Sequence, residues 1–197
     1  MKISRIIDLF NGWVGKLAML MILLATLISA GNALMRYTFN YSSNAYLEIQ
    51  WYLFGAVFML GGGYAFLRNA HVRIDVVNSR LSARGRNWVD VAGIVLFLFP
   101  MCYMLATMGW PLFERAWTSG EMSSSAGGLI RWPVFALIPL GFSLLALQGV
   151  SELIKRLNFL LAGGPDPLDH TGPSETQLLA KEITQEEKSP AVEGRAS

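Results

Sequence analysis

Residues Val91–Phe113 read VAGIVLFLFPMCYMLATMGWPLF, a run that contains no Asp, Glu, Lys, Arg or His. A helix rises about 1.5 Å per residue, so a run of this length crosses the hydrocarbon layer of a bilayer, which is about 30 Å thick. Three further runs have the same character: Leu17–Met35, Ile49–Leu67 and Trp132–Val150. The sequence therefore predicts an all-α membrane protein with four transmembrane helices, at about residues 14–35, 48–67, 89–113 and 132–153.

The overall composition agrees with a membrane protein. Of the 197 residues, 53% are hydrophobic and only 15% are charged, whereas about a quarter of the residues of a soluble domain are charged. The net charge of +2 is too small to indicate a nucleic-acid partner. A single cysteine, Cys102, excludes a disulfide framework within one chain.

The N-terminal segment resembles a signal peptide because Lys2, Arg5 and Lys16 precede an apolar stretch. The uncharged core that follows is 19 residues long, however, and signal-peptide cores have about 7–15 residues. We interpret it as a retained first membrane helix. We divide the chain into a four-helix transmembrane domain, 1–162, and a disordered cytoplasmic tail, 163–197, which is rich in Pro, Glu, Ser and Thr.

The orientation in the membrane is predicted from the Lys and Arg residues of the connections. Ten of them fall in the N-terminal segment, in the second connection and just after the fourth run, against three in the first and third connections. Positive charge is enriched in cytoplasmic segments. Both termini are therefore predicted to be cytoplasmic.

The second connection contains a second pattern. Ile74, Val77 and Leu81 recur at helical spacing, while arginines fall on another face. This arrangement is typical of a short helix that lies on the cytoplasmic membrane surface and binds lipid headgroups. Ser82 is predicted to cap the helix that continues into the third span.

Three local features predict details of the helices. Gly61–Gly63 indicates either a close approach of another helix or a local break. Pro100 predicts a kink, because proline removes a backbone donor. Arg131-Trp132-Pro133 is typical of a helix start, and Ser43 or Asn44 of a helix cap.

Groups that carry catalysis are missing. There is no phosphate-binding glycine loop with its lysine and no Cys/His cluster with metal-ligand spacing. We therefore expect no catalytic residue, no metal and no cofactor, and a protein that is not an enzyme. Two rivals remain, a stand-alone oligomeric small exporter and the membrane anchor of a redox complex. The first needs an acidic residue within a span, and the second needs paired histidines there.

The first connection has a charged residue at each of its ends. Arg36 ends the first predicted helix and Glu48 lies in the first turns of the second. We hypothesise that they form an ion pair or bind a partner's backbone at the periplasmic boundary.

Several short motifs, in this order and spacing, resemble the small membrane subunit of tripartite ATP-independent periplasmic (TRAP) transporters, the DctQ-like family. The resemblance covers about residues 5–160. It is carried by these stretches: Asn32 with Arg36-Tyr37, 47–54 (LEIQWYLF), 61–64 (GGGY), 69–75 (NAHVRID), 127–133 (GGLIRWP) and 139–142 (PLGF).

The resemblance implies a structural subunit of a solute importer in the bacterial inner membrane. It implies two protein partners, a large elevator-type permease that holds the sodium and substrate sites, and a periplasmic binding protein that delivers the solute, commonly a carboxylate. No substrate site is expected in this subunit. The candidate partner-interface or structural residues are Asn32, Arg36, Glu48, Gln50, Trp51, His71, Arg73, Asp75, Arg131 and Trp132.

Overall fold

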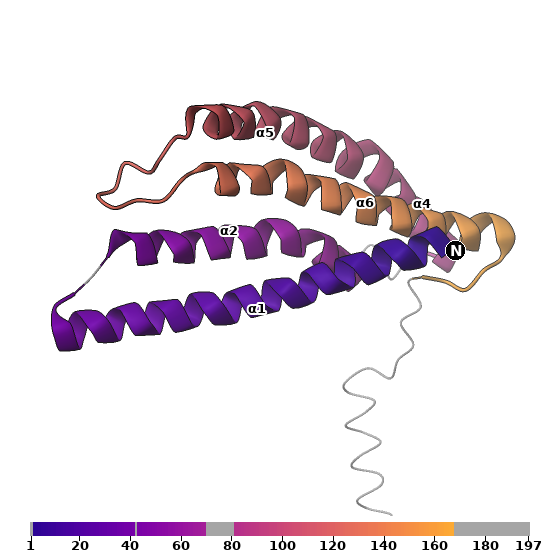
Figure 1. Ribbon diagram of the computed structural model, residues 1–197. Coiled ribbons are helices and arrows are strands. Elements are labelled where there is room, and N and C mark those ends of the chain that lie inside the picture. Colours follow the sequence, from indigo (N-terminus) through magenta and orange to yellow (C-terminus); the bar gives the residue numbers. More distant parts are fainter. Residues whose placement is uncertain (1, 42, 70–80, 168–197) are drawn as a thin grey trace, which may run out of the picture.

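The computed structural model describes residues 2–41, 43–69 and 81–167 (Figure 1). In these ranges the regular structure is helical, apart from one isolated antiparallel bridge between Met122 and Ile130. The helices are α1 (Lys2–Phe39), α2 (Asn44–Leu67), α4 (Ala83–Gly93), the π-helical turn η1 (Ile94–Leu98), α5 (Phe99–Ser119) and α6 (Trp132–Ala162).

Four helical segments are long and apolar enough to cross a membrane: Lys2–Phe39, Asn44–Leu67, Ala83–Ser119 and Trp132–Ala162. Each predicted span lies within one of these segments, which confirms the all-α, four-span fold. α1 has 38 residues, so at about 1.5 Å per residue it is far longer than a bilayer is thick. Its first turns therefore extend beyond the predicted span, which begins near residue 14.

The four segments run antiparallel to their chain neighbours and lie side by side in the order α1, α2, α6, α5 (Figure 1). α6 contacts α1, α2 and α5, and is the central helix. We call the end where α1 begins and α6 ends the terminal end. The opposite end, with the connections α1–α2 and α5–α6, is the hairpin end.

Two glycines let α2 and α6 approach each other closely. A Cβ atom on Gly63 would lie 2.6 Å from Oδ1 of Asn11 and 3.3 Å from the carbonyl oxygen of Leu144, and one on Gly141 would lie 2.7 Å from the carbonyl oxygen of Met59. Of the two predicted roles of the triple glycine, close approach is confirmed at Gly63. α2 continues as one helix through this stretch, so it contains no break.

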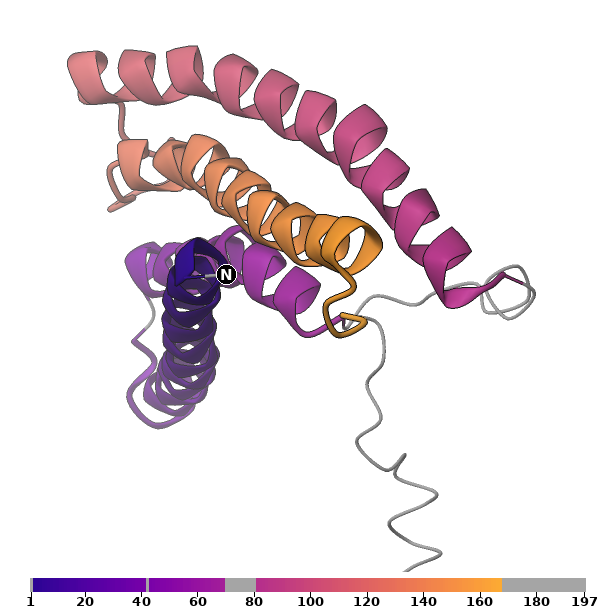
Figure 2. The same cartoon turned by 90° about the vertical axis from the view of Figure 1, so that its right-hand side faces the viewer.

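The third segment is curved where the sequence predicts a kink. The N–H of Phe99 donates to the carbonyl of Ile94, five residues back, and Pro100 follows directly. Proline has no N–H and its ring displaces the carbonyl four residues earlier, and a π-helical turn absorbs this local misfit. Figure 2 shows the segment bending around α6.

The predicted helix starts are found at the expected residues. The hydroxyl of Ser82 accepts a hydrogen bond from the N–H of Gly85 at 3.2 Å, and α6 begins at Trp132 with proline in its first turn. Ser43 occupies the N-cap position of α2, but its side chain makes no capping hydrogen bond. The predicted interfacial helix, apart from its end near Leu81, and residues 168–197 of the predicted tail lie outside the described residues.

Candidate functional site

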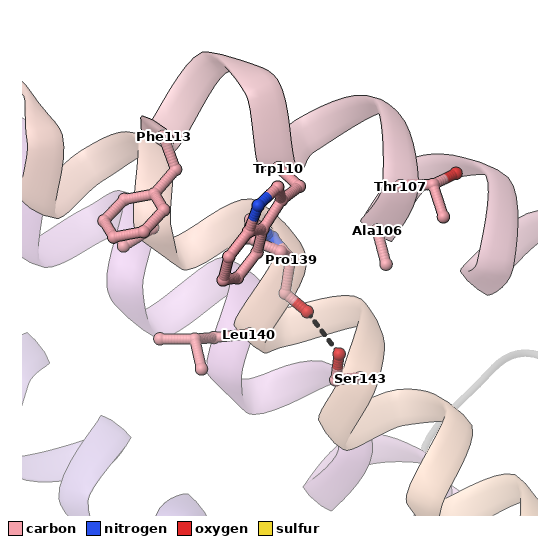
Figure 3. Close-up of a pocket in the computed structure, with 8 residues that line it drawn as sticks. Ala106, Thr107, Trp110, Phe113, Pro139, Leu140 and Ser143 are labelled. Carbon is pink, nitrogen blue, oxygen red and sulfur yellow. Dashed lines mark hydrogen bonds between the residues drawn. The ribbon is translucent and has the colours of Figure 1, made fainter. Parts of the chain in front are cut away.

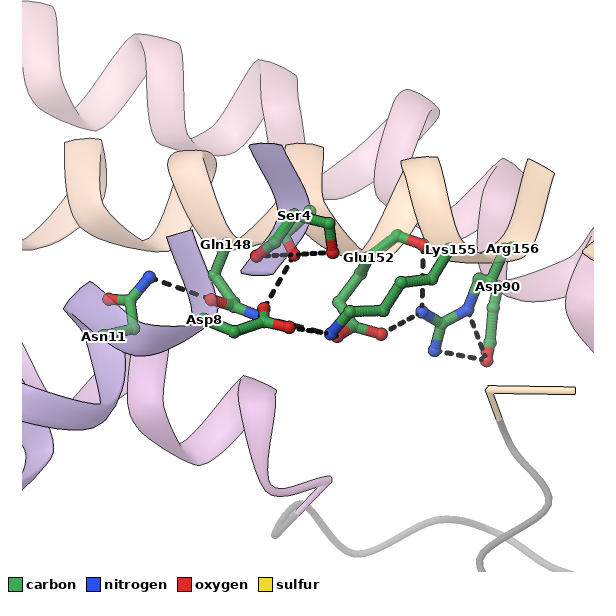
Figure 4. A network of polar contacts seen from close by, with 9 residues as sticks. Ser4, Asp8, Asn11, Asp90, Gln148, Glu152, Lys155 and Arg156 are labelled. Atoms are coloured by element: carbon green, nitrogen blue, oxygen red, sulfur yellow. Dashed lines mark hydrogen bonds and ion pairs between the residues drawn. The ribbon is translucent and has the colours of Figure 1, made fainter. Parts of the chain in front are cut away.

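Polar side chains gather at the two ends of the helical layer, while the middle of each span is apolar. At the terminal end, nine residues of α1, α4 and α6 form a continuous network that we call the terminal cluster (Figure 4). Its members are Ser4, Asp8, Asn11, Asp90, Gln148, Ser151, Glu152, Lys155 and Arg156.

Hydrogen bonds join α1 to α6 on one side of the terminal cluster. The amide of Asn11 donates to Oε1 of Gln148 at 2.8 Å, and both side chains are fully buried. The hydroxyls of Ser4 and Ser151 lie 2.8 Å apart, and Ser151 also donates to Asp8 at 2.7 Å. Buried polar groups of this kind stabilise a structure only when they are paired, so the bonds fix how α1 lies on α6.

Charged groups continue the terminal cluster towards α4. Nζ of Lys155 lies 2.8 Å from Asp8 and 2.8 Å from Glu152. Arg156 pairs with Glu152 and reaches Asp90 of α4 at 3.1 Å. Glu152 and Arg156 are almost fully buried, at 3% and 1% exposure. Loss of either one leaves the other as a buried charge with fewer partners, which is costly.

The helical period brings these side chains to facing surfaces. Ser4, Asp8 and Asn11 lie four and three residues apart on α1, and Gln148, Glu152 and Lys155 repeat the same kind of spacing on α6. Residues three or four apart share one face of a helix. The terminal cluster was not among the residues predicted from the sequence, although the matched spacing of polar residues beside two apolar runs indicates it.

Asp8 lies before the predicted first span, and its ionised form is stabilised. Burial raises the pKa of Asp8, but hydrogen bonds from Lys155, Ser151 and Gln148 and the positive charge of Lys155 outweigh it. The pKa therefore lies below its ordinary value. At neutral pH the carboxylate is charged and holds three donors of α6.

The segment after α6 also contacts this end. α6 ends at Gly163, which has the left-handed conformation (φ 66°) typical of a helix C-terminus. The chain then turns, and Oδ1 of Asp166 accepts a hydrogen bond of 2.8 Å from the buried amide of Asn87 on α4. Residues 163–167, which the sequence assigns to the tail, thus contact the helical domain.

At the hairpin end, the start of α2 holds the connection between α5 and α6. Glu48 accepts hydrogen bonds from the hydroxyl of Ser123 and, at 2.7 Å, from the N–H of Leu129. The hydroxyl of Tyr52 donates to the carbonyl of Ile130 at 3.1 Å. α2 therefore supplies both an acceptor and a donor to backbone groups of one loop.

Of the two alternatives proposed for Arg36 and Glu48, the ion pair is not formed in the described structure, and binding of a partner's backbone stays a prediction. Both carboxylate oxygens of Glu48 bind the α5–α6 loop, and Arg36 is exposed and forms no ion pair within the described residues. The two residues flank one short connection in the sequence, but this proximity does not bring their side chains together in space. The loop that contacts Glu48 lies about 80 residues further along the chain.

The other candidates differ in their surroundings. Trp51 is 75% exposed, and Arg131 forms an ion pair of 2.7 Å with Glu121. Trp132 stacks edge-on against Trp117, with ring centroids 4.7 Å apart.

Two further candidate residues, Asn32 and Gln50, each have a buried polar atom without a hydrogen-bond partner in the described structure. These atoms are Oδ1 of Asn32 and Nε2 of Gln50. His71, Arg73 and Asp75 lie outside the described residues.

An apolar groove of about 480 Å³ runs between α5 and α6 (Figure 3). Its two hydroxyl groups, on Thr107 and Ser143, bond to carbonyls of their own helices. The two hydroxyl groups are therefore not free to bind a ligand, and the surface that the groove presents is mainly hydrocarbon. Among residues 2–41, 43–69 and 81–167, no three His, Cys, Asp or Glu side chains converge as metal ligands would.

Comparison with known proteins gives one match. The family model described as "Tripartite ATP-independent periplasmic transporters, DctQ component" matches residues 25–159. No curated protein and no solved structure matches the chain. The matched region includes α2, α4, α5 and most of α6, with the polar residues at both ends of α6. It begins after Ser4, Asp8 and Asn11, the residues that α1 contributes to the terminal cluster. Because the match covers more than half of the chain, the chain belongs to the DctQ component family of the tripartite ATP-independent periplasmic transporters.

Proposed function

We propose that this chain is the small permease subunit that braces the large, elevator-type permease of a TRAP transporter. The observation that carries the proposal is the position of its charges. The four uncharged runs Leu17–Met35, Ile49–Leu67, Val91–Phe113 and Trp132–Val150 contain no Asp, Glu, Lys, Arg or His. A transport path for an ion or an anion normally places such groups near the midplane. The chain is thus suited to support a partner and not to carry solute itself.

The polar ends fit this bracing role. The terminal cluster ties α1, α4 and α6 together, and Glu48 ties α2 to the loop before α6. Paired polar groups at both ends hold the relative positions of the helices. The membrane-facing surface of such a layer stays apolar and can pack against a moving partner or against lipid.

Transport chemistry is assigned to the partners. We propose that a periplasmic binding protein delivers the solute, a carboxylate, and that the large subunit couples its uptake to sodium. This chain then has no enzymatic activity of its own. The support is the family membership together with the absence of charged residues from the four uncharged runs.

Reconstitution tests the proposal. Vesicles that contain the large permease and this chain are expected to take up solute when the binding protein and a sodium gradient are present. Vesicles with this chain alone are expected to take up none. A one-to-one complex should be recovered on copurification. Sodium-driven uptake by this chain alone would falsify the bracing role.

We further propose that both termini are cytoplasmic in the inner membrane, on the ten-to-three excess of Lys and Arg. Reporter fusions after Ile130 and after Leu161 test the orientation. The first is expected to report the periplasm and the second the cytoplasm. The reverse pattern would overturn this orientation.

A further inference from the structure

A polar pocket opens between α1 and α2 at the terminal end. It encloses about 300 Å³, and its walls include Gly12, Trp13, Lys16, Tyr64 and Arg68. No heavy atom lies within 4 Å of the position of a Cβ on Gly12, so the backbone of α1 is open here. One lining residue, Asp8, also bonds to α6 within the terminal cluster.

Two cations of the pocket lack a carboxylate partner. In the described part of the chain, Nζ of Lys16 lies 5.0 Å from the ring centroid of Trp13, Arg68 donates a hydrogen bond to Tyr64, and neither forms an ion pair. The one acidic residue of the pocket, Asp8, is already paired with Lys155 at 2.8 Å. Within the described residues, the pocket therefore presents to an anion two cations that have no carboxylate partner.

Packing between α1 and α2 holds Arg68 in place. A Cβ on Gly15 would lie 2.3 Å from the ring of Tyr64, so that ring lies directly on the backbone of α1. The hydroxyl of Tyr64 accepts a hydrogen bond of 3.1 Å from Nε of Arg68, and the guanidinium lies 5.4 Å from the ring centroid. A cation that is held before binding loses less conformational freedom when an anion arrives.

Lys16 and Arg68 are also expected to lie at the same depth in the membrane. Lys16 directly precedes the uncharged run Leu17–Met35, and Arg68 directly follows the uncharged run Ile49–Leu67. In a spanning chain both side chains lie at the boundary between hydrocarbon and water, where phospholipid headgroups are. Trp13, which is 64% exposed, is the kind of aromatic residue found at that level.

We propose that this pocket binds the phosphate headgroup of an anionic phospholipid, such as phosphatidylglycerol, between Lys16 and Arg68. The lipid headgroup is favoured over a soluble phosphate because both cations lie at the end of an apolar run, beside which an acyl chain can lie. The inference depends on membrane insertion and not on the proposed role in transport.

The test measures lipid binding by the full purified chain in mild detergent. Native mass spectrometry is used to titrate phosphatidylglycerol and, in parallel, zwitterionic phosphatidylcholine. Each cation near a headgroup contributes about fivefold in affinity, so Lys16→Gln and Arg68→Gln should each weaken phosphatidylglycerol binding about fivefold and the double variant about thirtyfold. Phosphatidylcholine binding should change much less.

Matched variants separate this site from general charge attraction. Lys2→Gln with Arg84→Gln removes two exposed cations outside the pocket and is expected to leave binding nearly unchanged. Gly12→Leu keeps every charge but fills the opening, and it should weaken binding as the charge variants do. Circular dichroism on heating checks that each variant is folded.

Three results would overturn the proposal. In the first, the pocket variant and the control variant lose the same affinity. In the second, Gly12→Leu is folded and binds phosphatidylglycerol as the unchanged chain does. In the third, inorganic phosphate or glycerol phosphate competes fully at equal concentration, which would identify a soluble anion as the ligand.

Discussion

The side chains of Asn11 on α1 and Gln148 on α6 are joined by a buried hydrogen bond of 2.8 Å across 137 residues of sequence. The bond lies beside Gly63, where α1, α2 and α6 meet, because a Cβ on that glycine would contact both Asn11 and the backbone of α6. One polar pair and one glycine thus define where three of the four helices meet.

The pair makes a direct prediction about stability. Gln148→Met leaves the buried NH2 group of Asn11 without its acceptor, and Asn11→Leu leaves Oε1 of Gln148 without its donor. Each change should lower the free energy of unfolding by about 1–3 kcal/mol. The double variant removes both polar groups and should cost less than the sum. Unfolding is followed by circular dichroism in mixed micelles of mild detergent and SDS. Additive losses would show that the two amides do not stabilise each other.

Substitution of the charged residues of the terminal cluster is predicted to lower stability more than substitution of Asn11 or Gln148. Arg156→Met leaves the buried carboxylate of Glu152 with fewer partners and should destabilise the protein by about 3–5 kcal/mol. Adding Glu152→Met removes the stranded charge and should recover part of this loss. Arg115→Met on α5, outside the cluster, is the control and should change stability little. An effect of Arg156→Met no larger than that of Arg115→Met would contradict the structural role of the network.

The triple glycine gives a prediction with a control inside the same motif. Gly63→Ala forces a Cβ to within 2.6 Å of Asn11, whereas a Cβ on Gly62 meets nothing within 4 Å. Gly63→Ala should therefore destabilise the protein, while Gly62→Ala should be neutral or should stabilise it by up to about 1 kcal/mol through helix propensity. The midpoints of thermal unfolding compare the two. Equal effects would contradict the close approach at Gly63.

The hairpin end is predicted to depend on Glu48 and not on Arg36. Glu48→Gln weakens the acceptor for the N–H of Leu129, so hydrogen exchange at that amide should become faster. Arg36→Ala should leave this exchange unchanged, and the effects of the two substitutions on stability should add to within about 0.5 kcal/mol. Strong coupling between them would restore the ion pair that the structure does not contain.

The segment after α6 divides the predicted tail into two parts. A chain that stops after Pro167 keeps the hydrogen bond from Asn87 to Asp166, and one that stops after Gly163 loses it and leaves a buried amide with one partner fewer. The shorter chain should be less stable by about 1–3 kcal/mol. Thermal unfolding of the two truncated chains measures the difference. Identical midpoints would show that residues 164–167 contribute nothing.

The number of spanning helices and their sequence along the chain followed from the amino-acid sequence alone, whereas α1, with 38 residues, extends well beyond its predicted span. Each uncharged run must satisfy its backbone hydrogen bonds internally in a bilayer, and a helix is the local structure that does so. Three local signals also predicted the observed structure, whereas Ser43 occupies the N-cap position of α2 without a capping hydrogen bond. Ser82 caps the third segment, Pro100 is preceded by a π-helical turn, and Trp132-Pro133 begins α6.

The partners of individual polar residues were decided by the tertiary structure. Glu48 lies near Arg36 in sequence but contacts Ser123 and Leu129, because the order of the helices places the α5–α6 loop over the start of α2. Asp8 and Lys155 are likewise joined only because the terminal ends of α1 and α6 lie side by side. Helical spacing shows which face of a helix a residue occupies, but only the packing of the helices determines what that face meets.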